Sequence, residues 1–266
     1  MSIREMIVKY QRDGLSRQMA SARVCQDIIL KSIADGPLMS NVTIKGGVVM
    51  RSITNNNRRA TRDIDIDFIH YSLSDDSIRL FIQKLNVLED VNIEIDGEIQ
   101  ELHHQDYQGK GINVRITDEK GYSIVTKMDI GVHKHFDIEQ EEFLFDVCMS
   151  DEGVSLFKNS VEQSFVEKLR SLLKFGPNSQ RYKDIYDLYY LKDLVDIERL
   201  NNAMRVLVFN DEGMRENNYS DVVNRVKKTF DDKNYLYNVS ASWQRWLDDD
   251  IMDIASGIID FLADRI

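Results

Sequence analysis

The sequence predicts an α+β protein, in which a half with both strands and helices is followed by a half made of helices. Alternating apolar and polar residues, a pattern typical of strands, recur up to Met149. From Ser160 onward the apolar residues follow helical spacing instead. Only two prolines, Pro37 and Pro177, interrupt the 266 residues, which favours long uninterrupted elements. We therefore expect two domains, at residues 1–155 and 156–266.

The elements of the first half follow from local spacing. Apolar periodicity predicts a helix from Ile3 to Ala34 that ends at Gly36 and Pro37. Val42 and Ile44 predict a short strand that runs into a tight turn at a glycine pair. A helix is expected at residues 74–88, and further strands are expected at residues 62–69, 91–95, 112–116, 122–130 and 143–149. Together these segments predict a sheet with flanking helices.

Three apolar stripes at helical spacing mark the second half. They comprise Phe165, Leu169 and Leu172; Ile185, Leu188 and Tyr189; and a last set running from Trp243 through Leu247, Ile251, Ile254 and Ile258 to Leu262. Each stripe predicts a helix with one buried face. The pair Trp243 and Trp246 is expected to pack into the core of this half.

Composition excludes several classes of protein. No run approaches the roughly 18 apolar residues that a membrane span needs, and the N-terminus lacks the apolar region of a secretory signal. Cys25 and Cys148 are the only cysteines and lie outside any CxxC spacing, which argues against a zinc site and a disulfide framework. The chain contains no GxxxxGK[ST], GxSxG or HExxH pattern. We expect a protein of the reducing cytoplasm with no membrane partner.

The formal net charge of −11 argues against a protein that coats nucleic acid through its overall field. It leaves room for a local basic groove, because four arginines fall in one short stretch: Arg51, Arg58, Arg59 and Arg62. Arginine makes bidentate contacts with phosphate, so these residues are candidates for binding incoming phosphates or an acceptor backbone. For each of them singly, a solvated basic loop remains an equal alternative.

An acidic strand carries the strongest chemical signal. Asp63, Asp65 and Asp67 alternate with apolar residues, so their side chains should share one face of a strand. Like charges in a column raise one another's pKa unless a cation lies among them, and Mg²⁺ or Mn²⁺ takes such oxygen ligands. Upstream, Gly46 and Gly47 would let backbone N–H groups approach phosphate oxygens. The alternative is a half-exposed strand whose polar face is acidic.

A second strand supplies a possible third ligand. Lys127 and Asp129 face one way in the expected strand, while Thr126 and Met128 face the other. If this strand pairs beside the first, Asp129 completes a site of three carboxylates. Without that pairing, a single aspartate in a strand is more often a solvated edge residue.

A third constellation lies in the helical half. Arg181, Asp184 and Asp187 repeat at a spacing of three, so they lie along one side of a helix. A segment containing Lys168 precedes them. The alternative is a run of surface ion pairs, each worth a few tenths of a kcal/mol.

These motifs together resemble the AbiEii-type nucleotidyltransferase toxins, a group that includes the MenT toxins and belongs to the DNA-polymerase-β-like superfamily. The resemblance covers roughly residues 40–192. It rests on four motifs in order: Gly46-Gly47; Arg59-x-Thr61-x-Asp63-Ile64-Asp65; Lys168-Leu169-x-x-Leu172; and Arg181-x-Lys183-Asp184-x-x-Asp187-Leu188. One position departs from the family, which usually has Ser or Thr after the glycine pair where this chain has Val48. The missing hydroxyl weakens the expected binding of phosphate.

The resemblance implies a bilobed fold, with a mixed-sheet nucleotidyltransferase lobe followed by a helical lobe. It implies that Asp63 and Asp65 bind metal and that Gly46 and Gly47 contact phosphate. It also assigns Lys168, with Asp184 or Asp187, to the other side of the catalytic cleft. Arg62 and Arg181 are further candidates for binding the nucleotide.

The expected reaction is transfer of a nucleoside monophosphate from an NTP by two divalent ions. As some members of the family act on RNA, the expected acceptor is the 3′ end of tRNA, in a toxin–antitoxin or abortive-infection system with a cognate antitoxin. Two alternatives stay open. One is transfer to a small molecule or a protein side chain, and the other is a nucleotide-binding module with little turnover.

Overall fold

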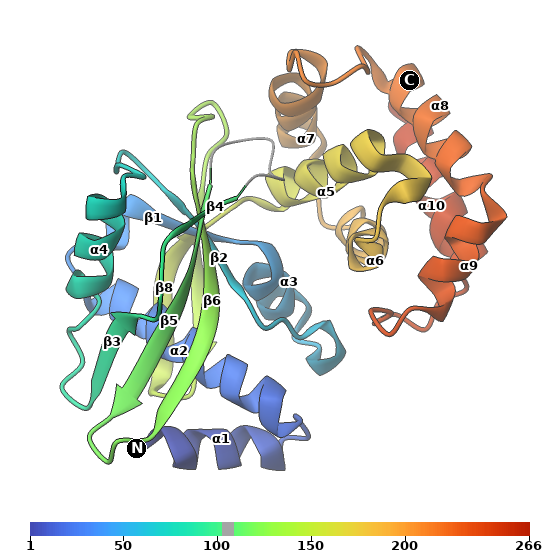
Figure 1. Cartoon of the computed structure of the whole chain (residues 1–266). Coiled ribbons are helices and arrows are strands. Elements are labelled where there is room, and N and C mark those ends of the chain that lie inside the picture. Colours follow the sequence, from blue (N-terminus) through green and yellow to red (C-terminus); the bar gives the residue numbers. More distant parts are fainter. Residues whose placement is uncertain (103–108) are drawn as a thin grey trace. The chain divides into compact units, whose positions relative to one another are not determined.

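The computed structural model describes residues 1–102 and 109–266 and divides into two compact units, Met1–Asn159 and Ser160–Ile266 (Figure 1). The first unit contains strands and helices, and the described residues of the second contain helices only. The α+β class is therefore confirmed. The assignment of separate functions to residues 1–155 and 156–266 remains a prediction.

Two helices, not one, open the first unit. They are α1 (Ile3–Arg12) and α2 (Arg17–Asp35), so the single helix expected from Ile3 to Ala34 is wrong. The break has a local cause. Gly14 has φ +93°, which is outside the right-handed helical region, and the Ser16 side chain accepts a hydrogen bond from the Met19 N–H to cap α2. Later in the unit come η1 (Met39–Asn41), α3 (Gly46–Thr54), η2 (Asn57–Arg59) and α4 (Asp75–Lys84).

The described part of the first unit forms one mixed sheet. Its strands are β1 (Val42–Lys45), β2 (Ile64–Phe68), β3 (Val91–Ile95), β4 (Gln100–Glu101), β5 (Lys110–Asp118), β6 (Ser123–Val132), β7 (Glu141–Val147) and β8 (Ser150–Lys158). Their order is β3-β5-β6-β2-β1-β8-β7, with β4 paired to β5. The central pairs β2–β6 and β1–β8 are parallel, and the other pairs are antiparallel.

Strand β8 was not predicted by the sequence. It follows β7 through a hairpin in which Phe143 pairs with Leu156, and it then pairs in parallel with β1, where Thr43 is opposite Phe157. It begins with Ser150 and three further non-apolar residues, and the alternating buried residues Val154, Leu156 and Lys158 occupy only its second half. That composition resembles a loop, and the pairing with β1 is not visible from local spacing.

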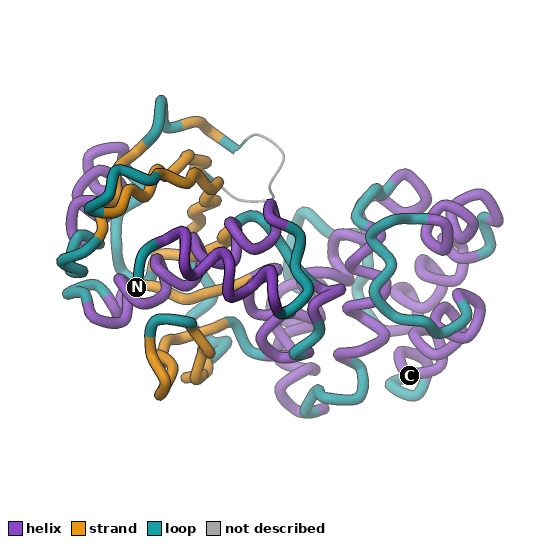
Figure 2. Tube along the Cα trace, turned by 90° about the horizontal axis from the view of Figure 1, so that it is seen from below, coloured by secondary structure: helices purple, strands orange, loops and turns teal. Residues whose placement is uncertain are grey.

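Helix α2 supplies much of the core of this unit by packing against β6, β7 and β8. The helices that follow the N-terminus lie beside strands of this unit (Figure 2). Ile28 and Ile29 of this helix are fully buried, as are Ile66 and Ile130 in the central strands. Burial of each such side chain contributes about 1.5–3 kcal/mol. These contacts fix the central strands that carry the acidic residues.

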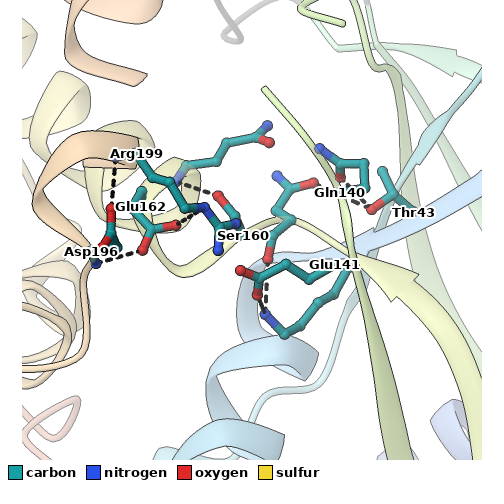
Figure 3. Close-up of polar contacts among 10 residues, drawn as sticks. Thr43, Gln140, Glu141, Ser160, Glu162, Asp196 and Arg199 are labelled. Carbon is teal, nitrogen blue, oxygen red and sulfur yellow. Dashed lines mark hydrogen bonds and ion pairs between the residues drawn. The ribbon is translucent and has the colours of Figure 1, made fainter. Parts of the chain in front are cut away.

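Polar contacts tie elements together within each unit (Figure 3). In the first unit the Thr43 hydroxyl donates to Oε1 of Gln140 at 2.6 Å. In the second unit the Ser160 hydroxyl caps α5, and Glu162 accepts from the Asp196 N–H at 2.9 Å. Arg199 lies 3.4 Å from the Glu162 carboxylate, so this buried group joins the start of α5 to the start of α7.

The second unit consists of helices α5 (Val161–Phe175), α6 (Tyr182–Leu191), α7 (Ile197–Met204), α8 (Tyr219–Phe230), α9 (Lys233–Ala241) and α10 (Ile251–Ala263), with a short turn η3 (Gly176–Asn178) and a π-helical turn η4 (Arg205–Phe209). Helix α10 packs against α6 and α8. Within the described ranges, no helix is long and apolar enough to cross a membrane.

The two tryptophans differ sharply in exposure. Trp246 is 1% exposed, as expected, but Trp243 is 81% exposed, so its predicted place in the core is wrong. The last helix begins only at Ile251, after Asp250 caps it through the Met252 N–H. Trp243 therefore precedes the helix, and its helical spacing from Leu247 has no structural meaning.

Candidate active site

Three neighbouring strands bring charged side chains together. In the antiparallel β1–β2 pair Lys45 is opposite Asp65, and in the parallel β2–β6 pair Asp65 is opposite Asp129. The condition under which Asp129 could join the acidic strand, pairing of β2 with β6, is thus met. Lys45 Nζ lies 2.5 Å from Oδ1 of Asp67, so the third aspartate of the column already has a buried partner. Asp63 is exposed just before β2 begins.

Asp65 is held where its negative charge is unfavourable. Burial raises the pKa of its carboxyl group, and the nearby charges of Asp129 and Asp63 raise it further. Lys45 and a hydrogen bond from the Gly47 N–H act in the opposite direction without cancelling this effect. The first unit therefore concentrates more negative charge here than its own cations neutralise.

Lys127 and Asp129 form an ion pair on β6, with Nζ 2.9 Å from Oδ1. Burial disfavours the charge of Lys127, but Asp129, Asp63 and Asp65 together raise the pKa of its amine. Lys127 thus responds to the same group of carboxylates as Asp65. Half of its side chain remains exposed, so the ion pair is screened by solvent.

The glycine pair lies against the acidic strand. Gly46 has φ +65° and begins α3, so the expected tight turn is the N-terminus of a helix. A Cβ atom at Gly46 would lie 2.8 Å from Cγ of Asp65, and one at Gly47 would lie 2.6 Å from Cβ of Thr61. The packing of this chain therefore requires glycine at both positions, because a side chain would collide with Asp65 or Thr61. Their contact with phosphate remains a prediction.

Val48 follows the glycine pair and is fully buried in the core. Val48 is the third residue of α3, so the first turn of this helix has no side-chain hydroxyl at that position. Packing accounts for the apolar residue at this position. It does not supply the phosphate contact that a Ser or Thr would add.

The donor set suits a divalent cation that is shared with a substrate. Among the described residues, no three His, Cys, Asp or Glu side chains converge to hold a metal ion by themselves. Mg²⁺ commonly takes only one or two carboxylates and completes its shell with water and substrate phosphates. Asp65 and Asp129 fit that requirement, because a cation between them would relieve the repulsion that raises the pKa of Asp65. The roles of Asp63, Asp65 and Asp129 as ligands remain predictions.

A buried network occupies the second unit. Lys168 Nζ on α5 lies 3.2 Å from Asp184 Oδ1 and 2.8 Å from Asp187 Oδ2, both on α6. Asp187 is fully buried and also accepts a hydrogen bond from Nε1 of Trp246 at 3.0 Å. The alternative of surface ion pairs is wrong for these three residues. It does describe Arg181, whose exposed side chain lies 2.7 Å from Oδ2 of Asp184.

The arginines of the basic stretch separate into two kinds. Arg51 and Arg59 are buried, with 8% and 3% of their surface exposed. Arg58 and Arg62 are exposed, so a solvated position is observed for them. The backbone carbonyl of Arg62 accepts a hydrogen bond from the Thr126 hydroxyl at 3.2 Å, which joins the start of β2 to β6. The binding of a nucleotide by the Arg62 side chain remains a prediction.

Sequence reasoning missed the partners of the predicted residues. Lys45 was not among the predicted site residues, although it ends a short apolar strand, is buried and therefore needs a carboxylate. Trp246 was assigned to the core, but its indole N–H also positions Asp187. A polar atom on a buried tryptophan signals such a partner. No local pattern indicates which acidic residue it is.

Comparison with known proteins decides the family. A profile of the AbiEii family, the nucleotidyl transferase toxin of type IV toxin–antitoxin systems, matches residues 28–256. The chain belongs to the AbiEii family. It is therefore a nucleotidyltransferase toxin, with a nucleotide substrate and an antitoxin as the partner that such a system implies.

One solved structure similar to this AbiEii protein is an antigenic nucleotidyltransferase-like protein from Paracoccidioides brasiliensis. The two are 12% identical with a TM-score of 0.48, and the match covers 82% of this chain and 91% of the other. No curated protein sequence matches the chain.

Proposed function

We propose that this AbiEii protein uses a divalent metal to transfer a nucleoside monophosphate from an NTP to RNA, with the 3′ end of tRNA as the acceptor. The observation that carries the proposal is the alignment of Lys45, Asp65 and Asp129 across β1, β2 and β6. It supports the polymerase-β-like form of nucleotidyl transfer, in which carboxylates on adjacent strands hold the metal. The RNA acceptor is an inference from the family resemblance.

In the proposed reaction an acceptor hydroxyl oxygen attacks the α-phosphorus of the NTP. A new P–O bond forms, the bond to the β-phosphate oxygen breaks, pyrophosphate leaves and the hydroxyl proton passes to solvent. Bound Mg²⁺ or Mn²⁺ would supply Lewis-acid stabilisation of the charge that develops on the phosphate oxygens. Asp65 and Asp129 would hold it, with Asp63 beside them.

Lys45 has a separate role in this proposal. Its ammonium group is fixed on Asp67 and acts to lower the pKa of Asp65, so it opposes the rise that burial causes. The N-terminus of α3 acts in the same sense through the Gly47 N–H. Both groups thus prepare Asp65 to meet a cation.

Residues 156–266 would contribute Lys168 and Arg181 to the triphosphate. Asp184 and Asp187 hold Lys168 in one position, which supports a role in binding because little side-chain entropy would be lost there. Arg181 is exposed and remains within reach of solvent anions. Lys168 and Arg181 are assigned to nucleotide binding, and Asp184 and Asp187 to positioning Lys168.

The test is incubation of the protein with Mg²⁺, each labelled NTP and tRNA, followed by sequencing of the tRNA ends. Wild-type protein should extend tRNA with at least one NTP, and Asp65→Asn should lower the rate roughly a hundredfold or more, because several kcal/mol of charge stabilisation is lost. Asp90→Asn, at an exposed aspartate, is the control and should leave the rate unchanged. Absence of transfer with every NTP, or equal transfer by Asp65→Asn, would contradict the proposal.

The same experiment separates the alternatives. Transfer that depends on Asp65 but reaches only a small molecule or a protein would keep the chemistry and change the acceptor. Calorimetry that detects metal-dependent NTP binding without turnover on any acceptor would favour a binding module. The observation that favours a binding module is the buried Val48, which provides no hydroxyl for phosphate.

A further inference from the structure

The first unit contains a polar cavity of about 490 Å³. Its walls come from α1, α2, the end of α3, the segment after it, and β7. Neither Asp65, Asp129 nor Lys45 lines it. Its volume falls in the range of sites for small organic ligands. The cavity is therefore a candidate site apart from the acidic strands.

Arg51 lines this cavity with an uncompensated charge. Its side chain is more than nine-tenths buried, and Nε and Nη2 have no hydrogen-bond partner among the described residues. No carboxylate of the described part of the chain forms an ion pair with it. Burying a guanidinium without an anion is strongly unfavourable, so an anion beside it would stabilise the folded protein.

The other arginine of the cavity is already neutralised. Arg23 Nε lies 3.1 Å from Oδ1 of the buried Asp27, and Nη2 donates to the Asp146 carbonyl at 2.8 Å. Tyr10 also donates its hydroxyl to Asp27, which completes this network. Arg51 is thus the cation in the described lining whose charge a ligand would balance.

Gln26 adds a second requirement. Its Nε2 donates to the Thr61 carbonyl at 2.9 Å, while its Oε1 is buried without a donor. A ligand that satisfies both residues must offer an anionic acceptor near Arg51 and a hydrogen-bond donor near Gln26. A simple carboxylate has no donor, whereas a phosphorylated nucleoside has sugar hydroxyl and base amino groups. Arginine also matches phosphate oxygens in a bidentate manner.

The remaining walls suit the rest of such a molecule. The consecutive amides Asn55, Asn56 and Asn57 contribute polar surface, together with Asp13 and Asp146. Phe143 and Leu144 on β7 contribute apolar surface, and Leu144 is 63% exposed. Amides can bind the edges of a base or sugar, and an apolar wall can cover its face.

We propose that this cavity binds a phosphate ester of mononucleotide size, with its phosphate at Arg51 and a donor group at Gln26. The site goes beyond the proposed transfer reaction, since it needs neither a divalent cation nor the carboxylates of β2 and β6. Thr61 connects the two regions, because it lines the cavity and also contacts the position where a Cβ on Gly47 would lie.

The probe is adenosine 5′-monophosphate, titrated by calorimetry into the full chain in the presence of EDTA. Binding should survive in Asp65→Asn, which makes it independent of the transfer reaction. Arg51→Met should weaken it at least tenfold, because a charge-assisted contact is lost. Arg79→Gln, which makes a comparable loss of charge on the exposed face of α4, should leave it unchanged.

Two further measurements guard against a purely structural role of Arg51. Without phosphate, Arg51→Met should melt at or above the temperature of the wild type, because it removes an uncompensated buried charge. In the wild type, the Nε–Hε resonance of Arg51 should shift when adenosine 5′-monophosphate is added. That resonance remains informative even if the variant fails to fold.

Three outcomes would overturn the proposal. One is the absence of binding, which would indicate a cavity filled by water only. The second is equal binding by Arg51→Met, or loss of binding in Asp65→Asn, which would place the probe elsewhere. The third is binding of inorganic phosphate or adenosine as tight as that of the nucleotide, which would exclude a phosphate ester as the ligand class.

Discussion

The buried carboxylates of the two units have different neighbours: a lysine in the helical unit, and other carboxylates at the acidic strands. In the helical unit, Asp184 and Asp187 both form ion pairs with one buried lysine, Lys168. At the acidic strands, Asp65 instead faces Asp129 and has Asp63 nearby, and its pKa is raised. The first arrangement is closed and supports the fold. The second carries an unbalanced charge, which is the physical condition for binding a cation.

The largest expected effect concerns the closed network. Asp187→Ala should destabilise the helical unit by about 3–5 kcal/mol, because it leaves a buried lysine undercompensated and the Trp246 N–H unpaired. Asp193→Ala breaks an exposed pair with Lys192 and should change stability by less than about 0.5 kcal/mol. Both tryptophans lie in this unit, so tryptophan fluorescence during chemical denaturation measures it directly. Equal effects of the two variants would show that the network does not support the fold.

The two tryptophans of the helical unit allow a second comparison of a buried with an exposed side chain. Trp246→Ala should cost about 3–5 kcal/mol, because it removes a buried ring and a partner of Asp187. Trp243→Ala should stay within about 0.5 kcal/mol, since that ring is 81% exposed. Circular dichroism during urea unfolding compares the two. A large loss in Trp243→Ala would contradict the exposed position.

At the acidic strands, backbone geometry gives an intermediate effect. Gly46→Ala should destabilise the first unit by roughly 2–3 kcal/mol, from a positive φ combined with a clash against Asp65. Gly14→Ala has a positive φ but no heavy atom near the added Cβ, so it should lose only about 1–2 kcal/mol. Hydrogen exchange of the β1 and β2 amides reports the difference. If the variants match, the contact between Gly46 and Asp65 carries no constraint.

The smallest effect has the opposite sign. A raised pKa means that folded Asp65 binds its proton more tightly than the unfolded chain does, so its ionisation reduces stability as the pH rises through that pKa. In metal-free buffer, Asp65→Asn should therefore gain stability relative to the wild type from acid toward neutral pH. Adding Mg²⁺ should stabilise the wild type and reduce the difference in stability between it and Asp65→Asn. If the stability of the wild type instead increases relative to Asp65→Asn as the pH rises, the pKa of Asp65 is not raised in the folded protein.

Local patterns predicted the parts of the site that a single strand determines. The alternation of Asp63, Asp65 and Asp67 indicated a strand whose acidic residues share a face, and Asp129 was placed correctly once pairing was assumed. The ion pair of Lys45 with Asp67 was not predicted, because it depends on the register of β1 against β2. Register is set by the whole sheet and its core, which a local window does not contain.

The same limit explains the errors in the fold. The apolar spacing from Ile3 to Ala34 continues across Gly14, where one backbone angle ends the helix. Spacing also treated Trp243 and Trp246 alike, although only Trp246 has an acceptor and a core to enter. Strand β8 pairs with β1, and the paired residues Thr43 and Phe157 are far apart in sequence. A local window therefore does not contain this pairing. Tertiary contacts override local propensity at Trp246 and at β8, whereas the break at Gly14 is set by the local backbone.

The parallel pairing of β1 with β8 also sets the order in which a growing chain can mature. Lys45 and the glycine turn leave the ribosome early, but the strand beside them ends at Lys158. Until that residue emerges, β1 lacks one neighbour and α2 lacks part of the surface it packs on. Contacts between such distant segments form slowly. The sheet beside Lys45 therefore cannot be completed until the chain has been translated through Lys158.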